Sequence, residues 1–385
     1  MQMNLDNIYT KAYGLEFLTA AEGLTLYQTA PLSELMGLAH LIRLKKAHSY
    51  VTWQIDRKIN ITNVCISGCQ YCNSYTEPQS PEAYITTLEE YIEKVEELLK
   101  YGGEQLVLQS GLNPELGIDF YKSLFSGLKE IFPGLKIHAL GAPEIAFLAK
   151  MEKLTYRQVL EQLVESGLES LPGHGGEILC ERVRHDLSPG RPDSSEWWGV
   201  MQEAHALGIA TSATIVFSNL ESPLEQIDHL VKIRDFQAQK PLGSPGFIEF
   251  IPTASGAGIY TLLAATSKLP QMLPEDYIRS VAISRIMLPN ISNIQASYQS
   301  VGKEVAQVCL HAGANDFGSI MLDDSLVFAD SVIKRMDAYD IQKAIADGGF
   351  EPKLRNRKYE LLDLPDCEFS RIMQFEELRT SPYNI

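Results

Sequence analysis

The first part of the chain carries apolar residues at helical spacing. Leu5, Ile8, Ala12 and Leu15 recur every three or four positions, and the stretch 32–46 repeats the pattern. This period is typical of amphipathic helices that lay one apolar face on a core.

From Lys58 onward, short apolar runs alternate with longer amphipathic segments. The runs that we predict to be strands are 58–65, 104–109, 135–140, 169–173, 210–217, 246–252, 290–297 and 315–320. Eight strand-then-helix units over roughly 270 residues are typical of an α/β (β/α)8 TIM-type barrel. An open doubly wound sheet gives similar alternation and is the alternative. In either fold, ligands bind at the carboxyl ends of the strands.

This pattern divides the chain into three expected parts. Residues 1–50 form an N-terminal helical extension, residues 51–330 the barrel, and residues 331–385 a C-terminal helix and a tail that pack on the barrel. The closing helix is expected at 340–347, before a charged tail.

Composition narrows the classes of partner. The 385 residues are 45% hydrophobic and carry a formal charge of −16 without a basic stripe, which argues against nucleic acid or an anionic membrane surface. No apolar run approaches the roughly 18 residues of a membrane span. The N-terminus lacks the basic flank and apolar core of a secretory signal. We therefore expect a cytoplasmic protein that acts on a small molecule.

The six cysteines are unevenly distributed. Three lie within residues 65–72, and the others are Cys180, Cys309 and Cys367. A small secreted disulfide framework has a different pattern, so a reducing compartment is expected. Cys180 and Cys309 lie in apolar helical contexts typical of buried structural thiols.

The cysteine group ends the first predicted strand in a C-x3-C-x-aromatic-C motif formed by Cys65, Cys69, Tyr71 and Cys72. Three thiolates on one tight loop can hold three irons of a cubane and leave the fourth iron open. The open iron can chelate the methionine part of S-adenosylmethionine (SAM), deliver an electron to the sulfonium and so release a 5′-deoxyadenosyl radical. A zinc site needs a fourth ligand that no nearby residue supplies. A ferredoxin-like electron carrier would not need a full barrel.

The motif, its place after the first strand and the strand count resemble the radical SAM superfamily. The resemblance implies one 4Fe-4S cluster, SAM and a reductant such as flavodoxin or ferredoxin. It also implies that Tyr71 lies beside the adenine. The segment Gly102-Gly103-Glu104, expected at the end of the second strand region, resembles the segment that grips the SAM amino group.

Longer stretches are similar to a narrower family. They are VTWQIDRKINITNVC, HALGAPEI, ESLPGHGGEIL, FIEFIP, SRIMLPNISNIQAS and HAGANDFGSIM. These resemble the dehypoxanthine futalosine cyclases of menaquinone biosynthesis over roughly residues 4–360. The resemblance implies a transferase-type reaction: hydrogen abstraction from a nucleoside-like substrate, attack of the carbon radical on an aromatic ring and a spiro-cyclic product.

The resemblance also assigns cofactor and substrate positions. Glu177 is expected to bind the ribose or methionine part of SAM, and Arg182 or Arg184 its carboxylate, with a surface salt bridge as the alternative for either arginine. The other expected cofactor positions are Gln109, Phe217 and Pro252. The expected substrate positions are His138, Ser218, Asn219, Thr253, Ser255, Gln295, Ser297, Tyr298 and Asn315. Loop capping is the alternative for the polar residues around the last two strands.

Several positions depart from the cyclase pattern, and they gather where the strands end. Thr253-Ala254-Ser255 stands in place of Trp-Pro-Phe, and His174 in place of a small residue. These exchanges remove large apolar walls and add polar groups. They favour a paralogue with a different substrate.

Three side chains are candidates for acid–base work. His174 could take the proton that an aromatic ring loses, because imidazole is the most common acid–base group in proteins, although it could instead bond backbone in a glycine-rich turn. Glu249 lies within a predicted strand, where a carboxylate is costly unless it is paired with a Lys or Arg. Asp316, in the eighth strand, is the third.

Three hypotheses follow. The chain is a futalosine-type cyclase, or a radical SAM paralogue with another aromatic or nucleoside-like substrate, or a non-catalytic cluster sensor or scaffold. Full biological activity of a Cys69→Ala variant would favour the last.

Overall fold

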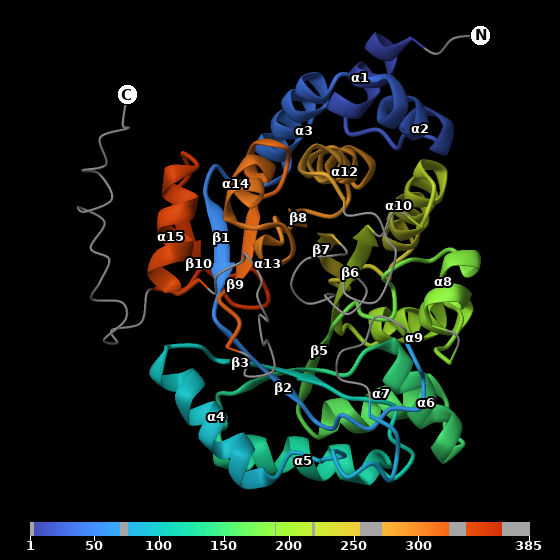
Figure 1. Ribbon diagram of the computed structural model, residues 1–385, viewed down its shortest axis with the longest axis vertical. Helices are drawn as coiled ribbons and strands as arrows, with labels where there is room; N and C mark the ends of the chain where they lie inside the picture. Colours follow the sequence, from blue (N-terminus) through green and yellow to red (C-terminus); the bar gives the residue numbers. More distant parts are fainter. Residues whose placement is uncertain are drawn as a thin grey trace.

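The computed structural model describes residues 4–69, 76–188, 190–217, 220–254, 272–322 and 336–363. Seven parallel strands form one curled sheet in the order of the chain, from β2 to β8 (Figure 1). Their bounds are β2 (Asp56–Asn60), β3 (Gln105–Gln109), β4 (Lys136–Ala139), β5 (Leu168–Leu171), β6 (Ala210–Phe217), β7 (Phe247–Ala254) and β8 (Asn293–Ile294).

Helices follow the strands and cover the outer face of the sheet. They are α4 (Leu88–Lys100), α5 (Ile118–Ile131), α6 (Ala142–Glu152), α7 (Tyr156–Glu165), α8 (Glu181–Leu187), α9 (Ser194–Ala206), α10 (Pro223–Ala238), α12 (Pro274–Met287), α13 (Tyr298–Val301) and α14 (Lys303–His311). The sequential strand order lacks the reversal of a doubly wound sheet, so the barrel prediction is confirmed.

The curl closes through β9 (Asp316–Ser319). This strand belongs to a second sheet, in which β1 (Val51–Gln54) lies between it and β10 (Pro352–Leu354). Single bridges, Gln295 to Asp316 and Arg57 to Leu322, join this part of the chain to β8 and to β2. The strand predicted at 58–65 ends earlier, at Asn60, and the sequence patterns did not predict β1 or β10.

The inner face of the curl is open to solvent in part. Along β2, Lys58 and Asn60 are half-buried while the residues between and after them are buried. Thr214 on β6 and Ile251 and Thr253 on β7 are likewise half-buried between buried neighbours. Because helices cover the outer face, the half-buried positions line the inside of the barrel.

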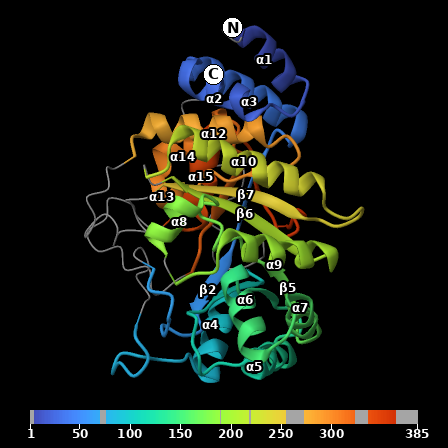
Figure 2. The ribbon, with the colours of Figure 1, turned by 90° about the vertical axis from the view of Figure 1, so that its right-hand side faces the viewer.

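The N-terminal residues form α1 (Leu5–Tyr13), α2 (Ala20–Thr29) and α3 (Leu32–Lys46). Leu35, Leu38 and Ile42 make the buried face of α3, at the helical spacing that the sequence predicts. Contacts of α3 with α12 and of α2 with α10 hold this group on the outer helices (Figure 2). The division at residues 50 and 330 stays a prediction.

The C-terminal part re-enters the barrel. The predicted closing helix is α15 (Ala338–Asp347), and β10 follows it and pairs with β1. Cys309 is fully buried as predicted, Cys180 is half-buried, and Cys367 lies outside the described residues. Within the described ranges, we find no helix with the length and apolarity of a membrane span.

Candidate active site

The cysteine loop follows β2 at the carboxyl end of the barrel. Cys65 and Cys69 are both buried, with 8% and 7% of their surface exposed. Tyr71 and Cys72 lie outside the described residues. Backbone hydrogen bonds anchor the loop on three sides: Cys65 N to Thr76 O (3.1 Å), Ile66 N to Leu112 O (3.1 Å) and Gly190 N to Ser67 O (3.2 Å).

Hydrogen-bond donors surround the described sulfur atoms. The Ser67 hydroxyl oxygen lies 2.9 Å from Cys65 Sγ and 3.3 Å from Cys69 Sγ, and the Leu112 amide donates to Cys65 Sγ at 3.3 Å. Hydroxyl and amide groups next to buried cysteine sulfurs are typical surroundings of cluster ligands. The described thiols therefore suit an iron–sulfur cluster. In the described part of the chain, which leaves out Cys72, no group of three His, Cys, Asp or Glu side chains is arranged around one metal position.

A glycine after β3 lets the neighbouring loop pack against the cysteine loop. A Cβ at Gly111 would lie 2.1 Å from Val64 O and 2.9 Å from the Cβ of Cys65, so any larger residue would displace one loop. Gln109, the last residue of β3, is half-buried beside it, and its carbonyl accepts from the Ile61 amide at 2.7 Å.

The expected position of Gly102, Gly103 and Glu104 is wrong. These residues come before β3, so they lie at the amino end of the barrel, opposite the cysteine loop. Gly102 has a φ of +77° and ends α4, and a Cβ at Gly103 would meet Leu98 at 2.2 Å. The glycines serve the helix end and its packing on the sheet, which removes the reason to assign the segment to SAM.

A buried ion pair lies beside the cysteine loop. Arg191 Nη1 is 3.0 Å from both carboxylate oxygens of Glu177, with 16% and 11% of the two side chains exposed. Burial alone would raise the pKa of Glu177, but Arg191 and the Gly175 amide outweigh it and lower that pKa to about 2. The neighbouring Gly190 donates to Ser67. No local motif marks Arg191 in the sequence, so this residue was not predicted.

The two arginines that the sequence suggested have other partners. Arg182 is 58% exposed in its side chain and pairs with Glu225 at 2.7 Å, as the surface alternative foresaw. Arg184 is buried and donates to the carbonyls of Gly175 and Pro192. Arg184 therefore holds backbone together, and Arg182 lies at the surface.

His174 pairs with a carboxylate at the same end of the barrel. Its Nε2 lies 2.9 and 2.8 Å from the two oxygens of Glu144, and 19% of the His174 side chain is exposed. Burial would raise the pKa of Glu144, but the facing imidazole outweighs it and lowers that pKa. Glu144 also accepts from the Gly141 amide at 3.0 Å, which fixes its position at the start of α6. Glu144 was not among the residues predicted from the sequence.

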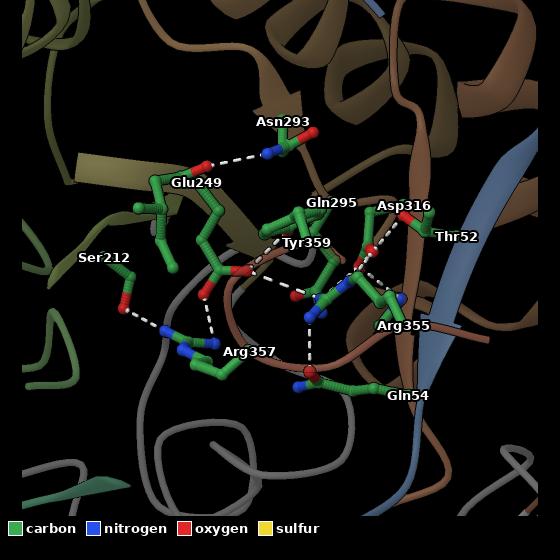
Figure 3. Close-up of polar contacts among 12 residues, drawn as sticks. Thr52, Gln54, Ser212, Glu249, Asn293, Gln295, Asp316, Arg355, Arg357 and Tyr359 are labelled. Carbon is green, nitrogen blue, oxygen red and sulfur yellow. Dashed lines mark hydrogen bonds and ion pairs between the residues drawn. The ribbon is translucent and has the colours of Figure 1, made fainter. Parts of the chain in front are cut away.

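The amino end of the barrel holds a separate ionic network (Figure 3). Arg355 contacts Asp316 at 2.5 and 3.0 Å, while Arg357 contacts Glu249 at 2.5 Å. The Tyr359 hydroxyl donates to Glu249 at 2.6 Å. All three of these donors come from the segment after β10, which covers the amino end of the barrel.

This network bears on two acid–base candidates. Glu249 and Asp316 are fully buried, and both sit early in their strands, away from the cysteine loop. Burial would raise the pKa of Glu249, but Arg357 and Arg355 outweigh it and lower that pKa. Paired carboxylates at this end are suited to holding the C-terminal segment, as the salt-bridge alternative for Glu249 foresaw, and the structure gives no support to a catalytic role for either.

The remaining expected positions fall into two groups. His138 lies on β4, 4% exposed, with Nδ1 2.7 Å from the Ser170 hydroxyl, and burial lowers its pKa well below the usual value. Thr253 on β7 and Gln295, which directly follows β8, are half-buried toward the barrel interior. Ser297 donates to Gln295 at 3.2 Å. Ser218, Asn219 and Ser255 lie outside the described residues.

Four of the expected site residues make packing contacts. Asn315 accepts from Arg285 on α12 at 2.7 Å, and the Pro252 carbonyl accepts from Tyr277 at 2.8 Å. Phe217 meets the Tyr277 ring edge-on at 6.2 Å, and Tyr298 stacks on Phe317 at 5.5 Å. These contacts join the ends of the strands to neighbouring helices, and a substrate or cofactor role for the four residues stays a prediction.

The comparisons of this chain with known proteins agree on one family. Residues 59–231 match the radical SAM superfamily, and residues 244–368 match the CofH/MqnC C-terminal region. The chain is 33% identical to the cyclic dehypoxanthine futalosine synthase of Streptomyces coelicolor, over 91% of this chain and 86% of the relative. It is 35% identical to a 5-amino-6-(D-ribitylamino)uracil–L-tyrosine 4-hydroxyphenyl transferase of Methanosarcina barkeri, over 80% of this chain and 79% of the relative.

Solved structures share the fold. The FeFe-hydrogenase maturase HydG superposes with a TM-score of 0.71 at 15% identity, over 93% of this chain and 77% of HydG. Methylornithine synthase (PylB) gives a TM-score of 0.67 at 19% identity, over 90% and 97% of the two chains. At these identities the likeness concerns the barrel alone.

Proposed function

Because this chain is a radical SAM enzyme of the family that includes cyclic dehypoxanthine futalosine synthase, we propose that it binds one 4Fe-4S cluster through Cys65, Cys69 and Cys72. The described thiols support this ligation, since they are buried and face hydrogen-bond donors. When bound, the cluster supplies the electron that cleaves SAM to methionine and a 5′-deoxyadenosyl radical. The third ligand rests on the spacing of the sequence motif.

SAM is held by Glu177 and Arg191 in this proposal. The pair is next to the cysteine loop through Gly190, and it offers one ionised carboxylate and one guanidinium. A carboxylate suits an ammonium or ribose hydroxyls, and a guanidinium suits a carboxylate. Arg191 therefore replaces Arg182 and Arg184 as the partner of the SAM carboxylate. The cysteine loop and the Glu177–Arg191 pair lie next to each other at the carboxyl end of the barrel, and this observation carries the proposed function.

The reaction that we assign is carbon–carbon bond formation to an aromatic ring, as in cyclic dehypoxanthine futalosine synthase. The substrate enters from the carboxyl end, where partly exposed positions of β2, β6 and β7 line the interior. His174 is the candidate to accept the ring proton, because it is partly exposed at this end and its Nε2 is oriented by Glu144. Gln109, Thr253 and Gln295 are the described candidates for substrate or cofactor contacts.

A second proposal keeps the radical chemistry and changes the substrate. The His174–Glu144 pair puts an imidazole and a carboxylate at the end of the barrel where a small molecule enters. Relatives with two different names also match at similar identity, 33% and 35%. These observations favour another aromatic or nucleoside-like substrate if the cyclase substrate is not turned over. In both cases we expect an external reductant such as flavodoxin or ferredoxin and a reducing compartment, the cytoplasm.

An anaerobic assay distinguishes the cyclase proposal from the proposal of another substrate. The reconstituted, reduced protein is given SAM and dehypoxanthine futalosine, and 5′-deoxyadenosine and the cyclised product are followed by mass spectrometry. Substrate-dependent formation of both compounds is expected for the cyclase. Slow 5′-deoxyadenosine release that is independent of the substrate, without cyclised product, assigns the chain to the second proposal. Absence of 5′-deoxyadenosine with a loaded cluster contradicts both.

A further inference from the structure

The hydroxyl of Ser67 lies between two sulfur atoms of the cysteine loop. It is 2.9 Å from Cys65 Sγ and 3.3 Å from Cys69 Sγ, and the residue is 5% exposed. We infer that Ser67 sets the reduction potential of the bound cluster by donating a hydrogen bond to its cysteine sulfur. The inference rests on the proposed ligation through this loop and goes beyond it, because nothing in the motif spacing requires a hydroxyl between the cysteines.

The direction of the hydrogen bond follows from the chemistry of a metal-bound cysteine. A ligating sulfur is a thiolate and has no proton to give, so the hydroxyl of Ser67 must be the donor. The Leu112 amide donates to Cys65 Sγ from the opposite loop at 3.3 Å, and the Ser67 amide lies 3.5 Å from the same atom. Cys65 Sγ therefore faces donors from two separate segments.

The surrounding backbone keeps the hydroxyl in place. The Gly190 amide donates to the carbonyl of Ser67 at 3.2 Å, and a Cβ at Gly190 would lie 2.4 Å from that oxygen. Gly68, with a φ of +59°, turns the chain so that Cys69 follows on the same side as Ser67. By contrast, Ile66 is 52% exposed. The position of Ser67 is thus set by the fold of the loop and by its neighbour.

A donor to thiolate sulfur acts more strongly on the reduced cluster, which carries one more negative charge. Hydrogen bonds to the sulfurs are among the features that set cluster potentials. The Ser67 hydroxyl is nearly buried, and a low local dielectric strengthens its effect. It therefore makes the cluster easier to reduce, and its removal lowers the potential.

The test compares three variants with the wild-type chain, each reconstituted anaerobically. Ser67→Ala removes the hydroxyl and Ser67→Thr keeps it. Ser166→Ala removes the hydroxyl of another largely buried serine, which donates to the Gln162 carbonyl at a helix end far along the chain. Potentiometric titration followed by electron paramagnetic resonance gives the midpoint potential, and iron and sulfide assays give the loading.

We expect Ser67→Ala to shift the ratio of reduced to oxidised cluster about tenfold toward the oxidised form at a fixed potential, about 59 mV for one electron. Ser67→Thr and Ser166→Ala should remain close to the wild type. An unchanged potential in a fully loaded Ser67→Ala protein overturns the inference and leaves the proposed cluster intact. A wild-type chain that binds no iron overturns the cluster proposal and this inference together.

A second measurement covers the case in which Ser67→Ala does not hold iron. Electron–nuclear double resonance of the wild-type cluster in H₂O and D₂O detects exchangeable protons next to the sulfurs. We expect a hydroxyl proton that exchanges and that Ser67→Thr retains. Absence of any exchangeable coupled proton in the wild-type chain contradicts the inference.

Discussion

Asp56 is a buried carboxylate whose pKa is subject to opposing effects. Its Oδ1 has no hydrogen-bond partner among the described residues, and Oδ2 accepts from Gln54 Nε2 at 2.5 Å. Burial raises the pKa of Asp56 to about 7, although Arg355 and Arg357 act in the opposite direction. The protonated form is therefore the one that the folded chain prefers.

This shift gives the folded protein a pH dependence with a definite sign. The folded pKa of Asp56 lies above the unfolded value of 3.8. The stability that protonated Asp56 contributes to the fold is therefore complete below about pH 3.8 and is lost as the pH rises through about 7. The Asp56→Asn variant, which needs no proton, should gain a few kcal/mol relative to the wild type between pH 4 and pH 8. Denaturant unfolding at several pH values measures the difference.

Asp119 provides the matched control for that prediction, because its side chain is 91% exposed. Asp119→Asn should leave the pH dependence of the free energy of unfolding as it is in the wild type. If Asp56→Asn and the wild type run parallel over the same range, Asp56 keeps its charge in the fold and the account of its burial is wrong.

The Glu177–Arg191 pair makes a prediction about SAM. Arg191→Ala removes the proposed partner of the SAM carboxylate and leaves Glu177 buried without its guanidinium, so the dissociation constant of SAM should rise at least tenfold. Equilibrium binding to the cluster-loaded protein measures this constant. Arg182→Ala, at the surface pair with Glu225, should bind SAM as the wild type does. Equal weakening by both variants would remove the distinction between the two arginines.

Among the elements, the loop after β3 controls the cysteine loop by close packing. The Cβ of a Gly111→Ala variant would lie 2.1 Å from Val64 O, so one of the two loops must move. We expect a several-fold loss of bound iron after reconstitution, measured by iron and sulfide assay. Gly127→Ala in α5, where a Cβ meets nothing within 4 Å, should keep the iron and gain up to about 1 kcal/mol of stability.

The segment after β10 holds the amino end of the barrel. Arg355→Met leaves Asp316 buried and without its guanidinium, which should cost about 3–5 kcal/mol of unfolding free energy. Lys353→Met, two residues earlier on β10 and in an exposed pair with Glu351, should change stability by no more than about 0.5 kcal/mol. Chemical denaturation of both variants distinguishes an energetic role of the network from a passive one.

The elements also show what the sequence could predict. Periodicity located every strand of the seven-stranded sheet, because each joins apolar residues to turn signals, and it located α15 for the same reason. It missed β1 and β10, which are short and pair with each other across roughly 300 residues of sequence separation. The misplacement of Gly102–Glu104 has a related cause, since a Gly-Gly-Glu segment looks the same before a strand as after one.

The candidate site was predictable only where its signal is local. The spacing of Cys65, Cys69 and Cys72 marks a cluster loop in the sequence itself. Only the fold brings Arg191 to Glu177 and Glu144 to His174, because 14 and 30 residues separate the partners in the sequence. Such pairs leave no pattern in the chain.

At the scale of the whole molecule, the two ends of the barrel carry different kinds of charge pair. The carboxyl end gathers the cysteine loop, Glu177–Arg191 and Glu144–His174 around an interior that solvent reaches. The amino end is closed by Arg355 and its neighbours, all fully or nearly buried. This division matches the rule that barrels place chemistry at the carboxyl ends of strands and stability at the other end.

The central claim is that one open cluster on the Cys65–Cys72 loop binds SAM. Anaerobic reconstitution with iron and sulfide, followed by electron paramagnetic resonance of the reduced protein with and without SAM, tests it most directly. The account predicts about four irons per chain, a 4Fe-4S spectrum that changes when SAM is added, and loss of both in a Cys65→Ala variant. About eight irons per chain, or a spectrum that SAM leaves unchanged, would contradict it.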